Sequence, residues 1–247
     1  SKYVNRSVAA FASLKEPIEW TRDGESIAVC INIGKPLDMK DTENEKMDGV
    51  GLFRSEFLYS SSAKKPTFEE QTEAYRTVIK KAYPNSVTIR TLDIGGDKQL
   101  EYLNMKKEEN PFLGNRGIRL CLSNKDIFEE QLRAILIAAA GEKVKIMLPM
   151  VTCISEIKRT KELLREICEK LDEEKTEYCK DATVGIMIET PASAITAADF
   201  AKHSDFFSIG TNDLVQYITA ADRGNTDVES VYNPYNPADL KTLAQVI

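Results

Sequence analysis

Residues 144–188 read VKIMLPMVTCISEIKRTKELLREICEKLDEEKTEYCKDATVGIMI, and this stretch decides the fold class. It begins with an apolar run at 144–150 and ends with another at 183–188, and each run has the length of a buried strand. Between them, residues 154–175 carry apolar side chains at helical spacing and charged side chains elsewhere. A strand, a helix and a second strand in this order predict a unit whose two strands run parallel.

The same alternation continues on both sides of this stretch. Asn236 and Pro237 suit the N-cap and first position of a helix, so the last helix is predicted to begin there. The further helices are predicted at 69–83, 125–140, 193–201 and 237–247, and the further strands at 26–32, 49–53, 87–92, 206–210 and, as a short one, 115–122. Seven strands without a duplicated half predict an α/β fold, a TIM-type (β/α)8 barrel truncated before the eighth strand.

The domain organisation follows from the same pattern. Residues 1–20 are predicted to be the remnant of a helical linker, and residues 21–247 a single barrel domain that is incomplete at its C-terminus. Such an open barrel would expose the edges of its first and last strands, which favours self-association or loss of order.

Composition excludes several classes of protein. The formal net charge is −6, so the chain as a whole does not attract nucleic acid or anionic lipid. The longest apolar run, 134–140, is too short to span a membrane. The five cysteines include no CxxC pair, and the N-terminus has no apolar signal segment, so we expect reduced thiols in a cytoplasmic protein.

Charged residues gather where the predicted strands end, which is where barrel enzymes place their active sites. Several arginines pointing toward one mouth would repel each other unless an anion joined them, and guanidinium groups suit phosphate and carboxylate. Two carboxylates beside them suit a hard cation such as Mg²⁺. The pattern therefore indicates a site for a phosphorylated carboxylic acid with Mg²⁺. Its residues are Arg54, Arg90, Arg116 and Arg223, with Glu189 and Asp213.

Each of these residues also has a purely structural interpretation. Arg54 could form a surface ion pair with Glu56, and Glu189 and Asp213 could be helix caps. The run at 95–98 (GGDK) reads as a plain turn. Arg90 lies inside an apolar strand, where a buried charge needs a partner, and this favours an anion contact. The chain contains no Walker A loop, GxGxxG, HExxH or zinc-ligand spacing, so the site prediction depends on the combination.

From about residue 23 onward, the sequence resembles enzyme I of the bacterial phosphoenolpyruvate-dependent sugar phosphotransferase system. The resemblance is strongest in GVGLFRSEFLYS (49–60), VTIRTLDIGGDK (87–98), ENPFLGNRGIR (109–119), KIMLPMV (145–151), GIMIETPAS (185–193) and DFFSIGTNDLVQYITAADRGN (205–225). The resemblance implies a barrel in which the four arginines and Asn212 bind phosphoenolpyruvate. It also implies that Glu189 and Asp213 bind Mg²⁺.

The family reaction moves the phosphoryl group of phosphoenolpyruvate to a histidine on a separate N-terminal domain and releases pyruvate. That domain then passes the group to a phosphocarrier protein, and the barrel domain dimerises. The only histidine here, His203, lies in no matching motif. The family also has a proton-donating cysteine on the eighth strand, and none of the five cysteines matches its position: Cys30, Cys121, Cys153, Cys168 and Cys179. We therefore expect that this chain alone does not complete the reaction.

Two alternatives remain open from the sequence. Pyruvate phosphate dikinase and phosphoenolpyruvate synthase share the barrel, although the sequences of residues 49–60 and 205–225 resemble enzyme I more closely. A non-catalytic domain that senses phosphoenolpyruvate would also carry the ligands without the proton donor.

Overall fold

A computed structural model describes residues 23–40, 48–61, 64–96, 100–103 and 105–247 of the chain. The predicted helical linker at 1–20 lies outside these residues. The described part contains one sheet of six parallel strands in the order β1-β2-β3-β4-β5-β6. The strands are β1 (Ile31–Ile33), β2 (Val50–Arg54), β3 (Val87–Arg90), β4 (Val144–Leu148), β5 (Thr183–Ile188) and β6 (Phe207–Ile209).

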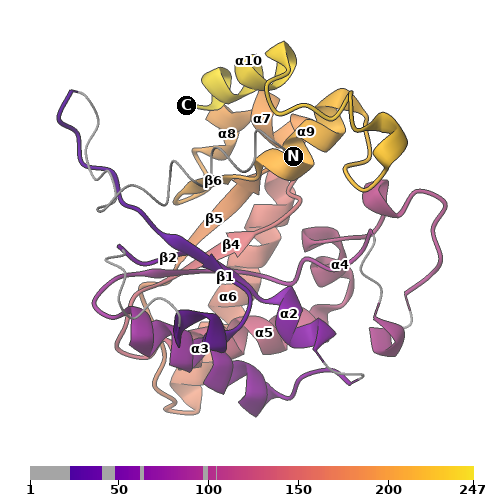
Figure 1. The fold of residues 1–247 in the computed structure, drawn as a ribbon. Helices are drawn as coiled ribbons and strands as arrows, with labels where there is room; N and C mark the ends of the chain where they lie inside the picture. Colours follow the sequence, from indigo (N-terminus) through magenta and orange to yellow (C-terminus); the bar gives the residue numbers. More distant parts are fainter. Residues whose placement is uncertain (1–22, 41–47, 62–63, 97–99, 104) are drawn as a thin grey trace.

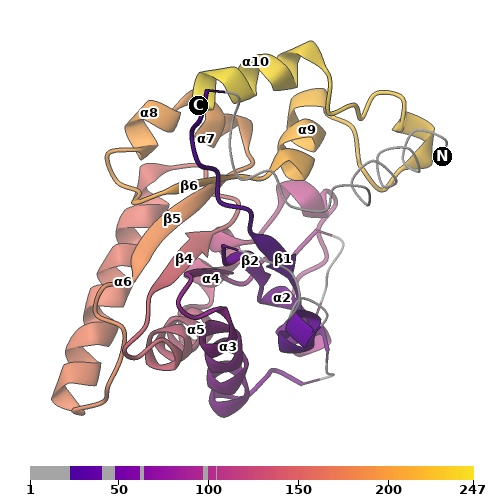
Figure 2. The same cartoon turned by 60° about the vertical axis from the view of Figure 1, so that its left-hand side comes forward.

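The sheet curls into a half-barrel with helices along its outer side (Figures 1 and 2). Helices α3, α5 and α6 pack side by side there, and α10 packs on α7 and α9 near the β6 end. The helices are α2 (Glu56–Ser60), α3 (Phe68–Ala82), α4 (Ile118–Ser123), α5 (Lys125–Ala138), α6 (Ile154–Glu173), α7 (Pro191–Ile195), α8 (Ala197–Phe200), α9 (Thr211–Thr219) and α10 (Pro237–Val246). Among the described strands β1 and β6 do not pair, so the sheet is open.

The βαβ unit predicted from residues 144–188 is confirmed as β4, α6 and β5. Ile146, Leu148 and Ile186 are fully buried in the core cluster, as expected for strands covered by helices. Helix α6 begins where the side chain of Glu156 accepts hydrogen bonds from the backbone N–H groups of Thr152 (2.7 Å) and Cys153 (2.9 Å). These bonds satisfy donors that a helix start leaves free.

The last described helix also begins as predicted. The side chain of Asn236 accepts a hydrogen bond from the N–H of Ala238 (2.9 Å), and Pro237 occupies the first position of α10. The single helix predicted at 193–201 is instead divided at Thr196 into α7 and α8.

The short strand predicted at 115–122 is wrong, because this segment leads into helix α4. Gly117 precedes the helix with a left-handed φ of 58°, which turns the chain away from an extended path. The N–H of Gly117 bonds to the carbonyl of Ile94, and the N–H of Ile118 bonds to that of Pro149. The backbone donors at this point therefore serve loop contacts rather than a strand ladder. As a consequence, β4 pairs directly with β3.

Alternation along the strands separates the core from the inner, concave side of the sheet. Ile89 on β3 is fully buried in the core, and the next residue, Arg90, lines a cavity on the inner side. In the parallel register Arg90 stands beside Arg54 of β2 on one side and Met147 of β4 on the other. The strand register thus places two arginines next to each other at the C-terminal end of the sheet.

Candidate functional site

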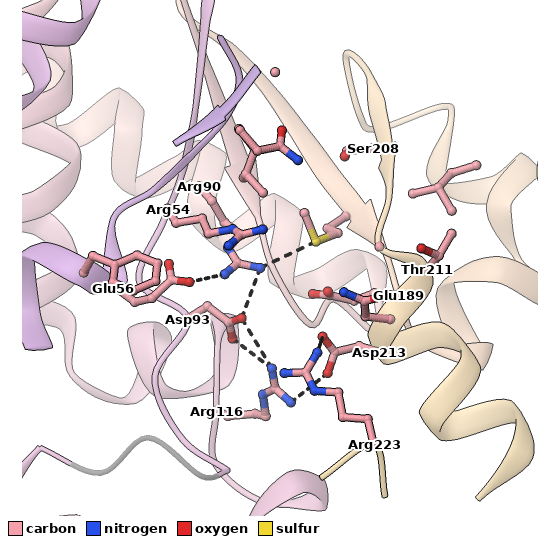
Figure 3. A pocket seen from close by; sticks show the side chains of 18 of the residues that line it. Arg54, Glu56, Arg90, Asp93, Arg116, Glu189, Ser208, Thr211, Asp213 and Arg223 are labelled. Carbon is pink, nitrogen blue, oxygen red and sulfur yellow. Dashed lines mark hydrogen bonds and ion pairs between the residues drawn. The ribbon is translucent and has the colours of Figure 1, made fainter. Parts of the chain in front are cut away.

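A cavity of about 480 Å³ lies at the C-terminal ends of the strands (Figure 3). All seven residues selected from the sequence line it: Arg54, Arg90, Arg116, Glu189, Asn212, Asp213 and Arg223. They come from β2, β3, the segment before α4, the end of β5, α9 and the loop after α9. In barrel enzymes the active site lies at the C-terminal ends of the strands, and applying this rule to the sequence selected residues up to 169 positions apart that line one cavity.

Arg90 is buried and paired on two sides. Its Nη2 donates to Glu56 Oε1 at 2.5 Å, and its Nη1 lies 3.2 Å from Asp93 Oδ2. Since Glu56 is itself only 2% exposed and contacts Arg90, the alternative of a surface ion pair between Arg54 and Glu56 is wrong. Arg54 is exposed and makes no ion pair with any described residue.

Arg116 is held in the same way from the other side of the cavity. Its Nη2 lies 3.3 Å from both carboxylate oxygens of Asp93, and its Nη1 donates to Asp213 Oδ1 at 3.1 Å. Asp213 Oδ2 in turn accepts from Nη1 of Arg223 at 3.4 Å. Acids and arginines thus alternate through the cavity wall, and we call this row the acid–arginine chain (Figure 3). It consists of Glu56, Arg90, Asp93, Arg116, Asp213 and Arg223.

Glu189 is a buried carboxyl group of which 1% is exposed. Its Oε1 accepts a hydrogen bond of 2.6 Å from the backbone N–H of Met150, a residue in the left-handed conformation (φ 59°). Burial raises the pKa of Glu189 to about 8, with further contributions from the negative charges of Asp93 and Asp213 and an opposing one from Arg90. A group in this state gains most from a nearby cation, which would replace the proton.

The segment around the start of α9 brings Asn212 and Asp213 to the cavity. Gly210 is required before them because a Cβ at this position would lie 2.8 Å from both Cβ and Oε2 of Glu189. Asp213 occupies the third position of α9, where Gly210 is the N-cap residue, and Thr190 caps α7. The helix-cap alternatives for Asp213 and Glu189 are therefore wrong. Asn212 is exposed, and its carbonyl accepts a hydrogen bond from the hydroxyl of Tyr232 (3.2 Å).

The turn predicted at 95–98 is described only for its two glycines. Gly95 (φ 118°) and Gly96 (φ 66°) both have positive φ, and a Cβ on Gly95 would meet the Cβ of Arg116 at 2.3 Å. The absence of a side chain thus lets the loop after β3 pack against Arg116. Residues 97 and 98 lie outside the described residues.

Several residues of the site have no functional role that the sequence alone indicates. Glu56 and Asp93 provide the carboxylates that hold the buried arginines. One signal was available for Asp93, since it lies three residues after Arg90 at a strand end. Asn32, Met187 and Ser208 also line the cavity, and although the last two lie in quoted blocks, no charge or spacing singles them out.

Glu189 and Asp213 are the candidates for holding a metal ion. The described residues contain no group of three or more acidic, histidine or cysteine side chains arranged for a metal, so the protein would supply two carboxylates. Mg²⁺ is commonly held by one or two carboxylates, with water and substrate phosphate completing its shell. The elevated pKa of Glu189 adds to the fit, because it arises from burial first and then from the charges of Asp93 and Asp213, and a bound cation would offset these effects.

Comparisons with known proteins identify the family of the chain. A family model described as "PEP-utilising enzyme, PEP-binding domain" matches residues 8–247. Over 97% of its own length, the chain is 47% identical to the phosphoenolpyruvate-protein phosphotransferase of Bacillus subtilis. Over 99% of its own length, it is 46% identical to that of Staphylococcus aureus. It covers 42% and 44% of these two relatives, respectively. Within the described residues, no helix combines the length and the apolar character needed to cross a membrane.

Proposed function

Because the chain belongs to the PEP-utilising enzyme family and matches its PEP-binding domain, we propose that the cavity binds phosphoenolpyruvate together with Mg²⁺. The observation that supports this most strongly is the convergence of four arginines with two buried carboxylates in one cavity. The enzyme I resemblance of the sequence is confirmed at the level of the family, since phosphoenolpyruvate-protein phosphotransferase, the name of the curated relatives, is another name for enzyme I.

Phosphoenolpyruvate offers a phosphate and a carboxylate, and each can accept paired hydrogen bonds from guanidinium groups. Arg54 has no ion-pair partner among the described residues, so its charge is available to an incoming anion without breaking an existing pair. Arg90, Arg116 and Arg223 would complete the anion site, and Asn212 would add an uncharged contact.

Glu189 and Asp213 would hold Mg²⁺ beside the phosphate. When bound there, Mg²⁺ would neutralise charge on the phosphoryl oxygens during transfer. The protein residues have two further tasks. The arginines orient the phosphate, and the N–H of Met150 fixes the direction of the Glu189 carboxyl group.

The full reaction involves more than this chain. The chain spans about two fifths of the curated phosphotransferases it matches, so the acceptor histidine on an N-terminal domain, the phosphocarrier protein and the homodimer are proposals from the family. Neither a histidine nor a cysteine is among the described residues that line the cavity. We therefore expect the phosphoryl acceptor and the proton donor for pyruvate from outside this sequence, and an eight-stranded barrel as the complete domain. The five free cysteines fit a reducing compartment such as the cytoplasm.

Calorimetric titration of phosphoenolpyruvate into this chain, with and without Mg²⁺, tests the proposal. Arg90→Ala removes a buried guanidinium from the cavity and should reduce affinity at least about a hundredfold, since charge-assisted contacts are among the strongest hydrogen bonds. Arg76→Ala is the matched control. Arg76 is a partly exposed arginine of α3 that contacts Glu73 on the same helix, away from the cavity.

The expected result is Mg²⁺-dependent binding that is lost in Arg90→Ala and retained in Arg76→Ala. Circular dichroism establishes that each variant is folded. A folded wild-type chain that does not bind phosphoenolpyruvate at millimolar concentration would contradict the proposal for this chain.

A further inference from the structure

The acid–arginine chain contains a carboxylate without an assigned role at its centre. Asp93 lies between Arg90 and Arg116, is 5% exposed, and contacts a guanidinium group on each side (Figure 3). Both arginines are buried as well, with 7% and 4% of their surfaces exposed. Two guanidinium groups brought this close in a buried place repel each other strongly unless a negative charge separates them.

We propose that Asp93 is a positioning residue that holds Arg90 and Arg116 in the arrangement required to receive one anion. This inference rests on the function proposed above. Asp93 directs Oδ2 toward Nη1 of Arg90 (3.2 Å) and both oxygens toward Nη2 of Arg116 (3.3 Å each). The other ion pairs of the two arginines are separate, with Glu56 for Arg90 and Asp213 for Arg116, so Asp93 is the carboxylate that they share.

The position of Asp93 in the chain explains why it can act on both arginines. It lies three residues after Arg90, the last residue of β3, so the two side chains leave the same short segment of backbone. Arg116 reaches it from the segment before α4, against which Gly95 packs without a side chain. The loop after β3 and the segment before α4 are thereby tied to each other at the floor of the site.

The geometry also separates this role from that of a metal ligand. Both oxygens of Asp93 face guanidinium nitrogen atoms, whereas Glu189 directs only Oε1 to a described donor, the N–H of Met150. A cation held by Asp93 would have to displace at least one arginine, and the same holds for Asp213, whose Oδ1 accepts from Arg116 and whose Oδ2 accepts from Arg223. We therefore assign Asp93 to the arginines and give the cation first to Glu189, with Asp213 exchanging one arginine contact for it.

The test is a double-mutant cycle measured by calorimetric titration of phosphoenolpyruvate at fixed Mg²⁺. Asp93→Asn keeps the shape but turns an amide N–H₂ toward one guanidinium, and it should weaken binding about tenfold or more. Arg116→Gln should also weaken binding. If Asp93 acts through Arg116, adding Asp93→Asn to Arg116→Gln should cost no more than about a further twofold, because residues acting as a unit are not additive. Asp126→Asn, on the exposed start of α5, removes the same charge as a control.

Asp93→Glu provides a second, charge-preserving variant in case Asp93→Asn does not fold, as judged by circular dichroism. It moves the carboxylate by about one methylene group and should weaken binding more than about threefold, since orientation depends on sub-ångström placement. Wild-type affinity in Asp93→Glu or Asp93→Asn would overturn the proposal, as would losses that multiply in the double variant. A wild-type chain that does not bind phosphoenolpyruvate would instead refute the function on which the proposal rests.

Discussion

Replacing Glu189 by glutamine should make the protein more stable at neutral and alkaline pH when no Mg²⁺ is present. Burial and the neighbouring acids raise the pKa of this carboxyl group from 4.5 to about 8 in the folded chain. Between these two values the folded state holds a proton that the unfolded chain has already lost. Wild-type stability therefore falls as the pH rises through this window, and it stops falling above the folded-state pKa. Glutamine has the shape of the protonated acid, can still accept from Met150, and does not titrate.

The size of the effect follows from the shift. One pKa unit corresponds to about 1.4 kcal/mol, so the difference in free energy of unfolding should change by about 3 kcal/mol in favour of the variant between about pH 5.5 and about pH 8. The stability advantage of the variant should reverse on adding Mg²⁺. The ion stabilises the wild type by binding its folded state, whereas the variant lacks one of the two proposed Mg²⁺ ligands.

Urea unfolding followed by circular dichroism measures this difference at several pH values, each with and without Mg²⁺. Glu73→Gln is the matched control, because the side chain of Glu73 is 70% exposed on α3. Its stability difference from the wild type should stay within about 0.5 kcal/mol at every pH. A difference between Glu189→Gln and the wild type that stays constant with pH, or that moves against the variant as pH rises, would refute the reasoning.

Two further predictions concern the core and the thiols. Gln131→Ala should lower the free energy of unfolding in urea by about 3 kcal/mol, because it leaves the buried N–H of Leu92 without its acceptor (2.9 Å in the wild type). A loss below about 1 kcal/mol would show that this buried hydrogen bond contributes little. In a thiol-labelling experiment followed by mass spectrometry, the exposed Cys30 should react in the native protein, and the buried Cys121 and Cys179 only after unfolding. Equal native rates at the three thiols would contradict their burial.

The parts of the fold that the sequence predicted well are those with long, regular patterns. Helix α6 has a charged face and an apolar face over 20 residues, and the strands beside it are continuous apolar runs. The segment 115–122 was assigned wrongly because a short apolar run fits a strand and a helix equally well. Its conformation depends on Gly117 and on loop contacts to Ile94 and Pro149, and these long-range contacts are not visible in local sequence.

Seven residues of the cavity wall were predictable from the sequence, but the contacts among its charged side chains were not. Parallel strands bring their C-terminal ends to one edge, so polar residues at those positions can be assigned to one cavity without coordinates. Which carboxylate contacts which arginine depends on side-chain directions across the cavity. Arg116 and Asp213 are 97 residues apart and meet only in the folded chain. The sequence therefore indicated an anion site and a cation site, while the acids that hold the arginines became visible only in the structure.

The balance of charges along the cavity wall affects how quickly an anion can arrive. Without Mg²⁺ and above the raised pKa of Glu189, four arginines face four carboxylates there, and the whole chain carries a formal net charge of −6. Under these conditions the mouth lacks the long-range attraction that accelerates association in proteins whose binding clefts carry one sign of charge. The association rate constant of phosphoenolpyruvate should then change little between low and physiological ionic strength. Recognition begins only at contact, where the anion meets guanidinium groups that the carboxylates already hold in position.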